Sequence, residues 1–299
     1  MSWGRVAIAV VILIGAWQAA AFLVTNERFE WDVVAQYLFD PTVLRGLAMS
    51  LMLTVIGMVL GSILGTLIAA GDLSGFAPIR WVSRVYVGIF RGIPPLVQLI
   101  FWFNLAYLIP RITVGVPYGP EFVSWSTNDI ITPITAAIIG LSLHEAAYMA
   151  EIVRSGILSV DHGQREAARA MGFNRNQAFF KIVLPQAMRV IIPPSGSQFI
   201  ALLKGTSLVS VIAMGDLLHS VQVIYNRTYQ IVPLLMVAVI WYLFVVTILT
   251  VGQRRLETHF GRGYTITSPP RGTRGDWRAR RKAWTTSPER AAHDREATA

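Results

Sequence analysis

Apolar stretches of about twenty residues recur along the chain, separated by short polar segments. Six of them approach or exceed the roughly 20 apolar residues that a membrane-spanning helix needs. They cover residues 6–24, 44–70, 86–109, 131–152, 190–212 and 232–251. This pattern predicts an all-α polytopic membrane protein with about six transmembrane helices, one at the N-terminus followed by five more.

The first stretch has two interpretations. Residues 1–43 are expected to form an N-terminal signal-anchor helix and an external segment. However, Arg5 precedes the apolar run and Ala19, Ala20 and Ala21 lie near its end. This order is also typical of a secretory signal peptide with a small-residue cleavage site, so cleavage stays open as an alternative. In both cases the segment after residue 24 lies outside, and the orientation of the other five spans is unchanged.

Glycines and prolines indicate how the spans pack. Gly57, Gly61 and Gly65 recur every four residues, which leaves a smooth stripe where another helix can approach closely. Residues 94–95 and 193–194 are proline pairs inside two other spans. Because proline removes a backbone donor and clashes with the preceding turn, each of these helices is expected to bend or break there. Such breaks are typical of a translocation path, but kinks also occur without that role.

Composition agrees with a membrane protein. Of 299 residues, 54% are hydrophobic and only 14% are charged, whereas soluble domains carry about a quarter charged residues. The absence of cysteine excludes disulfides, thiol nucleophiles and cysteine metal sites. The net charge of +9 does not indicate a nucleic-acid partner, because no aromatic-interleaved basic motif accompanies the arginines.

The distribution of positive charge predicts the orientation. Lys and Arg gather after the last span, and an excess of these residues marks cytoplasmic segments. We therefore place the C-terminus in the cytoplasm, and counting back places residues 71–85 and 155–189 inside as well, where both segments carry basic residues. Residues 264–299 have few large apolar groups and are expected to form a disordered basic cytoplasmic tail.

The second of these internal segments contains the most informative motif. It consists of Glu166, Ala167, Ala168, Gly172 and, after nine further residues, a segment that ends in Pro185. The alanines favour a short helix over residues 161–171, which Gly172 would end at the C′ position. Pro185 is expected to end a second helical segment before the next span. The result would be a compact, charged helix on the cytoplasmic side.

This motif resembles the cytoplasmic EAA motif of ABC importer permeases at every fixed position. In that family the loop is the coupling helix, which docks into a groove on the ATPase subunit. The resemblance therefore implies that Glu166, Ala167, Ala168 and Gly172 contact a partner ATPase and that Pro185 ends the module.

Further segments are similar to permeases of polar amino-acid ABC importers, the histidine, glutamine, glutamate and arginine type. Residues 90–98 (FRGIPPLVQ) resemble the family string FRGTPLLVQ, and residues 202–208 (LLKGTSL) resemble LLKDTSL. The resemblance assigns residues 44–263 to an ABC transporter permease domain. Gly205 stands where many relatives have aspartate and Ser197 where asparagine is common. The resemblance therefore does not identify which amino acid is transported.

The resemblance also implies the function and the partners. No GxxxxGK[ST] phosphate-binding loop occurs, so the chain is expected to be no enzyme and to hold no cofactor, with ATP and Mg²⁺ bound by a partner ATPase. It would translocate a polar amino acid into the cytoplasm across the bacterial inner membrane. The expected partners are the cytoplasmic ATPase, a second permease subunit, identical or related, an external solute-binding protein, the amino acid and membrane lipid.

Polar side chains near the middle of the spans are candidates for the substrate path, since such groups are costly in a membrane and should face a cavity or each other. They are Gln98, Ser142, Glu145, Gln198 and Lys204. Glu145 and Lys204 are expected to form a buried pair, either structural or in contact with the two charged ends of a zwitterionic amino acid.

Two rival functions are less favoured. An intramembrane enzyme could use His144 and Glu145, but no second catalytic constellation such as HExxH or GxSxG accompanies them. A channel would not need the coupling motif. We therefore predict no catalytic residue and no metal site in this chain.

Overall fold

The computed structural model describes residues 3–115 and 121–260. The first half of the chain forms α1 (Trp3–Thr25), η1 (Glu27–Phe29), α2 (Trp31–Leu38), α3 (Pro41–Asp72), α4 (Ala77–Gly92), α5 (Pro95–Phe103), α6 (Leu105–Leu108) and the strands β1 (Arg111–Gly115) and β2 (Glu121–Ser126). The second half forms α7 (Thr127–Ile130), α8 (Pro133–Leu158), α9 (His162–Ala170), α10 (Arg175–Ala178), η2 (Phe179–Val183), α11 (Leu184–Gly205), η3 (Thr206–Ile212), α12 (Leu217–Thr228) and α13 (Ile231–Phe260). The predicted tail, residues 264–299, lies outside the described residues.

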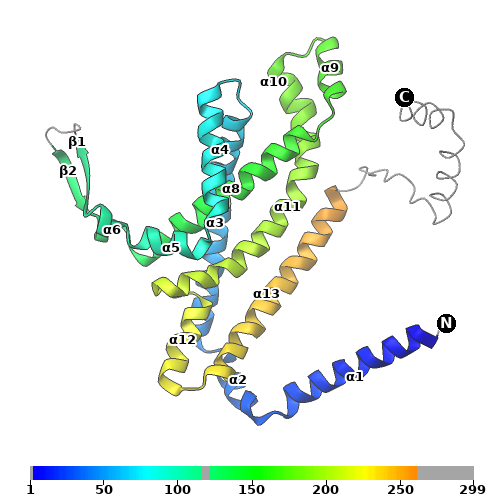
Figure 1. The fold of residues 1–299 in the computed structure, drawn as a ribbon, viewed down its shortest axis with the longest axis vertical. Helices are drawn as coiled ribbons and strands as arrows, with labels where there is room; N and C mark the ends of the chain where they lie inside the picture. The colour runs from blue at the N-terminus through cyan, green and yellow to red at the C-terminus, as the bar shows by residue number, and fades with distance from the viewer. Residues whose placement is uncertain (1–2, 116–120, 261–299) are drawn as a thin grey trace, which may run out of the picture. The chain divides into compact units, whose positions relative to one another are not determined.

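The membrane-spanning helices agree with the predicted number. Within the described ranges, four helices are long and apolar enough to cross a membrane, namely α1, α3, α8 and α13. Counting each of two bent pairs as one span gives up to six: α4 with α5, and the helical segment Arg175–Ile212 with α12 (Figure 1). The all-α polytopic fold is therefore confirmed, with the short antiparallel hairpin β1–β2 as an addition that the sequence pattern did not predict.

In the predicted span of residues 86–109, the expected break at Pro94–Pro95 is confirmed, but the predicted start is wrong. α4 begins at Ala77, well before the predicted start, and the chain turns by 101° between α4 and α5 at Pro94–Pro95. The internal loop that we expected over residues 71–85 is correspondingly short. α4 escaped detection because Arg80 and Arg84 lie on one face of an amphipathic helix and lower its average hydropathy.

The second proline pair behaves differently. α11 continues through Pro193 and Pro194 without interruption, so of the two expected outcomes, a bend or a break, the break is wrong. Transmembrane helices tolerate proline where neighbouring groups satisfy the freed backbone. The interruption comes later, after η3, where Ala213 has a φ of 56° and the buried carboxylate of Asp216 caps α12 by accepting hydrogen bonds from the backbone of Leu218 and His219.

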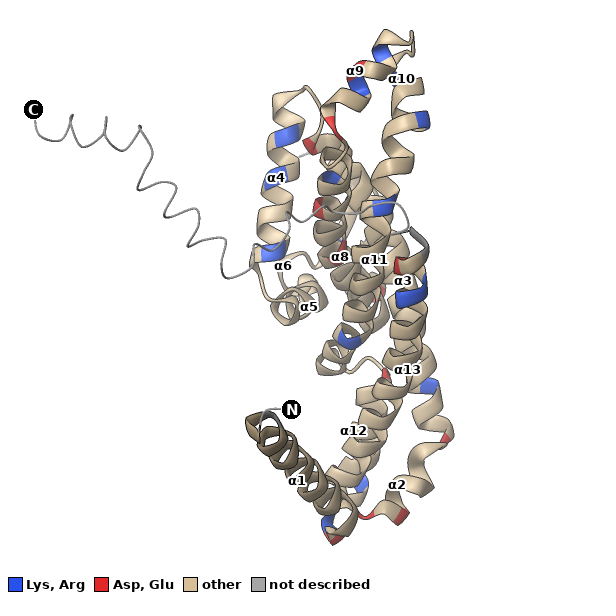
Figure 2. Cartoon of the chain, turned by 90° about the vertical axis from the view of Figure 1, so that its right-hand side faces the viewer, with Lys and Arg blue, Asp and Glu red and all other residues tan. Residues whose placement is uncertain are grey.

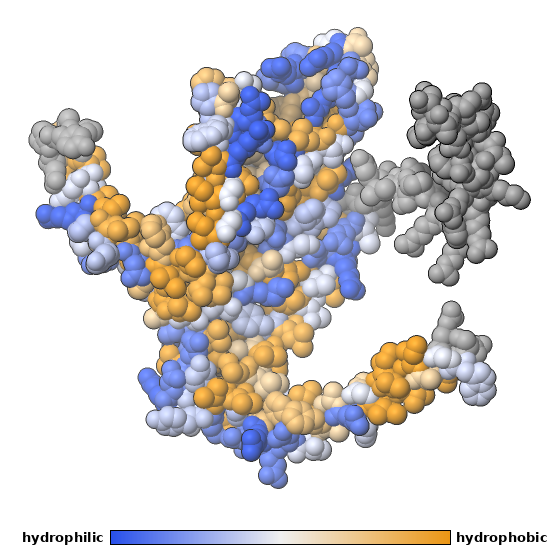
Figure 3. All heavy atoms as spheres, in the orientation of Figure 1, coloured by the Kyte–Doolittle hydropathy of each residue, from blue (hydrophilic) through white to orange (hydrophobic). Residues whose placement is uncertain are grey.

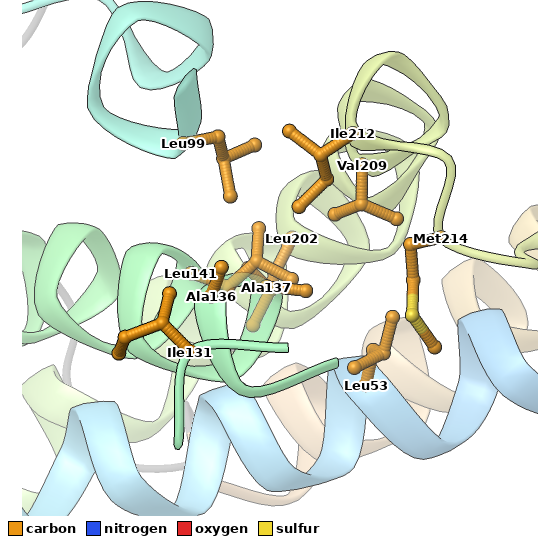
Figure 4. Close-up of a cluster of buried hydrophobic side chains, with 10 residues drawn as sticks. All are labelled: Leu53, Leu99, Ile131, Ala136, Ala137, Leu141, Leu202, Val209, Ile212 and Met214. Carbon is orange, nitrogen blue, oxygen red and sulfur yellow. The ribbon is translucent and has the colours of Figure 1, made fainter. Parts of the chain in front are cut away.

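The glycine stripe holds the two central helices together. A β-carbon on Gly61 would lie 2.7 Å from Cβ of Glu145, and one on Gly65 would lie 2.7 Å from the carbonyl oxygen of Ala146. The backbones of α3 and α8 therefore approach as closely as glycine permits, which confirms the predicted close packing. Beside this contact, a buried apolar cluster joins α3, α5, α8, α11 and η3 (Figure 4).

A second apolar cluster joins α2, α3, α12 and α13. Two hydrogen bonds attach the segment before α3 to α13 and to the loop that precedes it. Trp241 Nε1 of α13 donates to the carbonyl of Leu38 at 2.7 Å, and Gln230 Nε2 of the loop donates to Glu30 Oε2 at 3.0 Å. α1, by contrast, exposes nearly all of its side chains, most of them apolar (Figure 3).

Candidate coupling helix and substrate path

α9 has well-defined ends. At its start, Asp161 Oδ1 accepts a hydrogen bond from the backbone of Gly163 at 2.7 Å. At its end, the Gly172 N–H donates to the carbonyl of Arg169 and the Phe173 N–H donates to the carbonyl of Ala168. This is a Schellman motif, and it requires the left-handed backbone that Gly172 adopts, with a φ of 81°. The predicted short helix and its glycine end are confirmed.

The two faces of α9 have different environments. Ala168 is fully buried against its own chain. Ala167 and Gly172 are exposed, and so is the side chain of Glu166, whose Oε1 lies 3.2 Å from Nδ1 of His162. Of the residues expected to contact an ATPase, Glu166, Ala167 and Gly172 are therefore accessible, whereas Ala168 fixes the helix to the rest of the chain.

The expected role of Pro185 is wrong. A capping box between Asn174 and Gln177 starts α10, and the chain then passes through the π-helical turn η2 directly into α11, with Pro185 in its first turn. The Leu184 N–H donates to the carbonyl of Phe179, five residues back. Because the bonding pattern changes here, the missing N–H of Pro185 interrupts no regular α-helical ladder.

Gln98 stabilises the bend between α4 and α5. Its Nε2 donates to the carbonyls of Phe90 and Ile93 at 2.9 and 2.8 Å, and it lies 3.4 Å from Nδ1 of His144. The side chain is 5% exposed. Its amide nitrogen therefore satisfies backbone groups that the proline pair leaves unpaired, while its Oε1 is buried without a hydrogen-bond partner among the described residues.

Ser142 and Glu145 lie one turn apart on α8 and are both buried, as their spacing predicts. Ser142 Oγ and Glu145 Oε1 have no hydrogen-bond partner in the part of the chain that the structure describes. The stem of Glu145 packs on Gly61 of α3. Buried polar atoms without a partner are uncommon, which makes this face of α8 a candidate polar site. Gln198 lies half-buried on α11.

The expected ion pair between Glu145 and Lys204 does not form. Lys204 is exposed on the last turn of α11, whereas Glu145 is 2% exposed, and no salt bridge joins them. Similar depth in consecutive spans does not fix the rotation of each helix about its axis, and here the two side chains face different surroundings.

This geometry predicts the outcome of a charge exchange. Glu145→Lys should leave an uncompensated cation in the helix interface and destabilise the protein by about 2.5–3.5 kcal/mol. Adding Lys204→Glu should not restore the thermal unfolding midpoint of the purified protein, since the two sites do not meet. Lys204→Met alone should change stability by less than about 0.5 kcal/mol, as exposed substitutions usually do. Recovery in the double variant would contradict the structure.

Sequence reasoning missed a charged cluster where α3, α4 and α8 meet. Asp72 forms salt bridges with Arg84 and Arg154, whose Nε atoms lie 2.6 and 3.6 Å from its carboxylate oxygens. Arg154 forms a second salt bridge, 2.7 Å long, with Glu151 Oε1. These residues line a cavity of about 380 Å³, and Figure 2 shows charged residues where α4 and α8 run side by side. The cavity thus offers both carboxylates and guanidinium groups, the groups that recognise the two ends of a zwitterion.

Comparison with known proteins now gives the family. Residues 57–262 match the family described as the inner membrane component of binding-protein-dependent transport systems. The chain belongs to this family. As a binding-protein-dependent transport component it lies in the inner membrane, and the match covers α8, α9 and α11, the elements that carry the coupling motif.

Curated relatives of this transport component are permease proteins of amino-acid systems. It is 41% identical to the arginine transport system permease protein ArgU of Corynebacterium glutamicum, over 88% of this chain and 81% of that one. It is 37% identical to the glutamate/aspartate import permease protein GltK of Escherichia coli, over 67% and 84%. The L-cystine transport system permease protein TcyB of Bacillus subtilis is 36% identical, over 80% and 95%. The resemblance to polar amino-acid permeases is confirmed.

A solved structure supports the same assignment of this transport component. An amino acid ABC transporter crystallised with histidines matches with a TM-score of 0.65 and 30% identity, over 75% of this chain and 97% of that one. The MetNI methionine ABC transporter in an inward-facing conformation matches with a TM-score of 0.59 but 20% identity, which is a likeness of fold alone.

Proposed function

We propose that this permease imports a polar amino acid into the cytoplasm, driven by ATP that a partner ATPase hydrolyses. The observation that carries the proposal is α9, a capped helix that presents Glu166, Ala167 and Gly172 on an accessible face while Ala168 anchors it. A rigid protruding helix of this kind suits a docking contact. The names of the relatives, which refer to arginine, glutamate/aspartate and cystine, support the substrate class.

The proposal includes the partners and the orientation. The ATPase would bind α9 from the cytoplasm and would hold ATP and Mg²⁺. A second permease subunit, identical or related, would complete the path, and an external binding protein would deliver the amino acid. The C-terminus would lie in the cytoplasm, as the excess of basic residues after the last span suggests.

We further propose that the charged cluster, rather than Glu145 with Lys204, meets the charged ends of the amino acid. Glu151 and Asp72 would attract the ammonium group, and Arg154 and Arg84 would attract the carboxylate. The cluster already contains both signs of charge around one cavity. An incoming zwitterion can therefore exchange one set of ion pairs for another without leaving a charge unpaired.

Reconstitution tests this function directly. The permease, its ATPase and its binding protein are placed in liposomes, and uptake of labelled arginine, glutamate and cystine is measured with and without ATP on the ATPase side. We expect ATP-dependent uptake of at least one polar amino acid. Glu151→Gln should raise the KM for uptake and change folding little. The control variant Glu27→Gln on η1 should leave the KM unchanged. ATP-independent flux would contradict an importer and would favour a channel.

A further inference from the structure

A second cavity lies behind the coupling helix and is unrelated to the substrate path. It has a volume of about 230 Å³. Its lining comes from α8, α9, α10 and η2, and comprises Ile157, Arg165, Arg169, Arg175, Ala178, Phe179 and Val183. A cavity of this size has room for one tetrahedral oxyanion together with several waters.

Arg165 is held in place at this cavity but is not satisfied. One of its terminal nitrogens donates to the carbonyl of Ile157 at 2.7 Å, which anchors the guanidinium against the end of α8. Its Nε is buried and has no hydrogen-bond partner within the residues that the structure describes. A buried charged donor without an acceptor is unfavourable; because protein atoms cover Nε, an anion in the cavity would meet the terminal nitrogens of Arg165 and not Nε.

The charges around the cavity all have the same sign. Three guanidinium groups line it, and no Asp or Glu is among the lining residues. The two acidic residues of the module are engaged elsewhere, because Asp161 caps the start of α9 and Glu166 contacts His162. Like charges that converge on one cavity repel each other, and an anion between them would remove this repulsion.

We propose that this cavity binds a phosphate-type anion. Guanidinium groups pair with phosphate through two parallel N–H donors, which gives arginine its preference for such groups. The cavity lies on the side of α9 that faces its own chain, since Ala168, three residues after Arg165, is fully buried. The anion would therefore brace α9 against α8 and η2 from behind and leave the exposed face of Glu166 free. Its source is either free phosphate or the headgroup of an anionic phospholipid.

The test uses the full-length chain in nanodiscs. The ATPase is left out because its nucleotide site would also bind phosphate, whereas this chain has no phosphate-binding loop of its own. In one arm the lipid is phosphatidylcholine only and inorganic phosphate is titrated against chloride at equal ionic strength, with the thermal unfolding midpoint as the measure of binding. In the other arm phosphatidylglycerol is included without phosphate, and lipid retained on the protein is counted by native mass spectrometry.

We expect saturable binding in at least one arm, and the arm in which it occurs identifies the source. Arg169→Gln and Arg175→Gln should weaken it by about tenfold or more, since each removes a charge-assisted contact; both side chains are exposed, so both variants should fold. The matched control is Lys181→Gln, which removes a cation of the same module that lies over Phe173 and not at the cavity. It should change binding by less than about twofold.

Three results would overturn the proposal. The first is that neither probe binds saturably to the wild-type chain. The second is that Lys181→Gln weakens binding as much as Arg169→Gln does. The third comes from a separate pull-down with the purified ATPase: the arginine variants lose association with it while phosphate and lipid binding are unchanged. That result would assign the cavity to a carboxylate of the ATPase. None of these measurements depends on transport, so the proposed import activity stands or falls separately.

Discussion

Gly172→Asp should abolish uptake in the reconstituted transporter while the protein still inserts in the membrane. A β-carbon at this position meets no atom within 4 Å, so an aspartate side chain would point into open space beside the exposed face of α9. If the ATPase docks there, the new charge lies in the contact, where a like charge or an unpaired carboxylate weakens association strongly. Pull-down of the ATPase and ATP-driven uptake measure the two effects.

The matched control is Gly172→Asn. Asparagine and aspartate both tolerate the left-handed backbone that a φ of 81° imposes, and they have nearly the same shape. They differ in charge, so the asparagine variant should retain most of the uptake. Equal uptake in the two variants, both near wild type, would show that Gly172 is not at the ATPase contact.

Gly65→Val should prevent the normal packing of α3 on α8 and greatly reduce the yield of folded protein. Even a β-carbon at Gly65 would lie 2.7 Å from both the carbonyl oxygen of Ala146 and Cβ of Met149. Because one is a backbone atom and the other a Cβ atom, neither can move away unless α8 itself moves. Overpacking of this kind destabilises by about 1–3 kcal/mol or more. Fluorescence-detected size exclusion after a temperature series measures it.

Gly252→Ala provides the control for this variant. Gly252 lies inside α13, and a β-carbon there meets nothing within 4 Å. The methyl group should therefore be neutral or slightly stabilising, because alanine is the better helix former. If Gly65→Val and Gly252→Ala had the same elution profiles and melting temperatures, the close contact between α3 and α8 would be wrong.

Local signals in the sequence were sufficient for the coupling helix. Its N-cap Asp161, its alanines and Gly172 lie within twelve residues of each other, so no distant contact is needed to interpret them. The same holds for the break at Pro94–Pro95. The glycine stripe was equally clear, because the residues of one helix face follow directly from helical spacing.

The charged cluster of α3, α4 and α8 depended on information that no single segment carries. Asp72 and Arg154 meet although 82 positions separate them, and only the approach of α3 to α8 brings them together. The pairing of Glu145 with Lys204 was predicted only from their similar depth in the membrane, but the rotation of each helix about its axis is set by its packing against neighbours. Hydropathy also failed for α4, where arginines on one face hide a helix that is apolar on the other.

The π-helical turn Phe179–Val183 has a consequence for how this loop can change during evolution. One extra residue in an α-helix rotates everything after it by about 100°, which would turn the inward side of α11 toward lipid. A π turn instead absorbs such a residue locally. The π turn thus lets the fixed spacing from Gly172 to Pro185 coexist with the alignment of α11 against its neighbours, and deleting one residue of η2 should restore a regular α-helix but shorten that spacing.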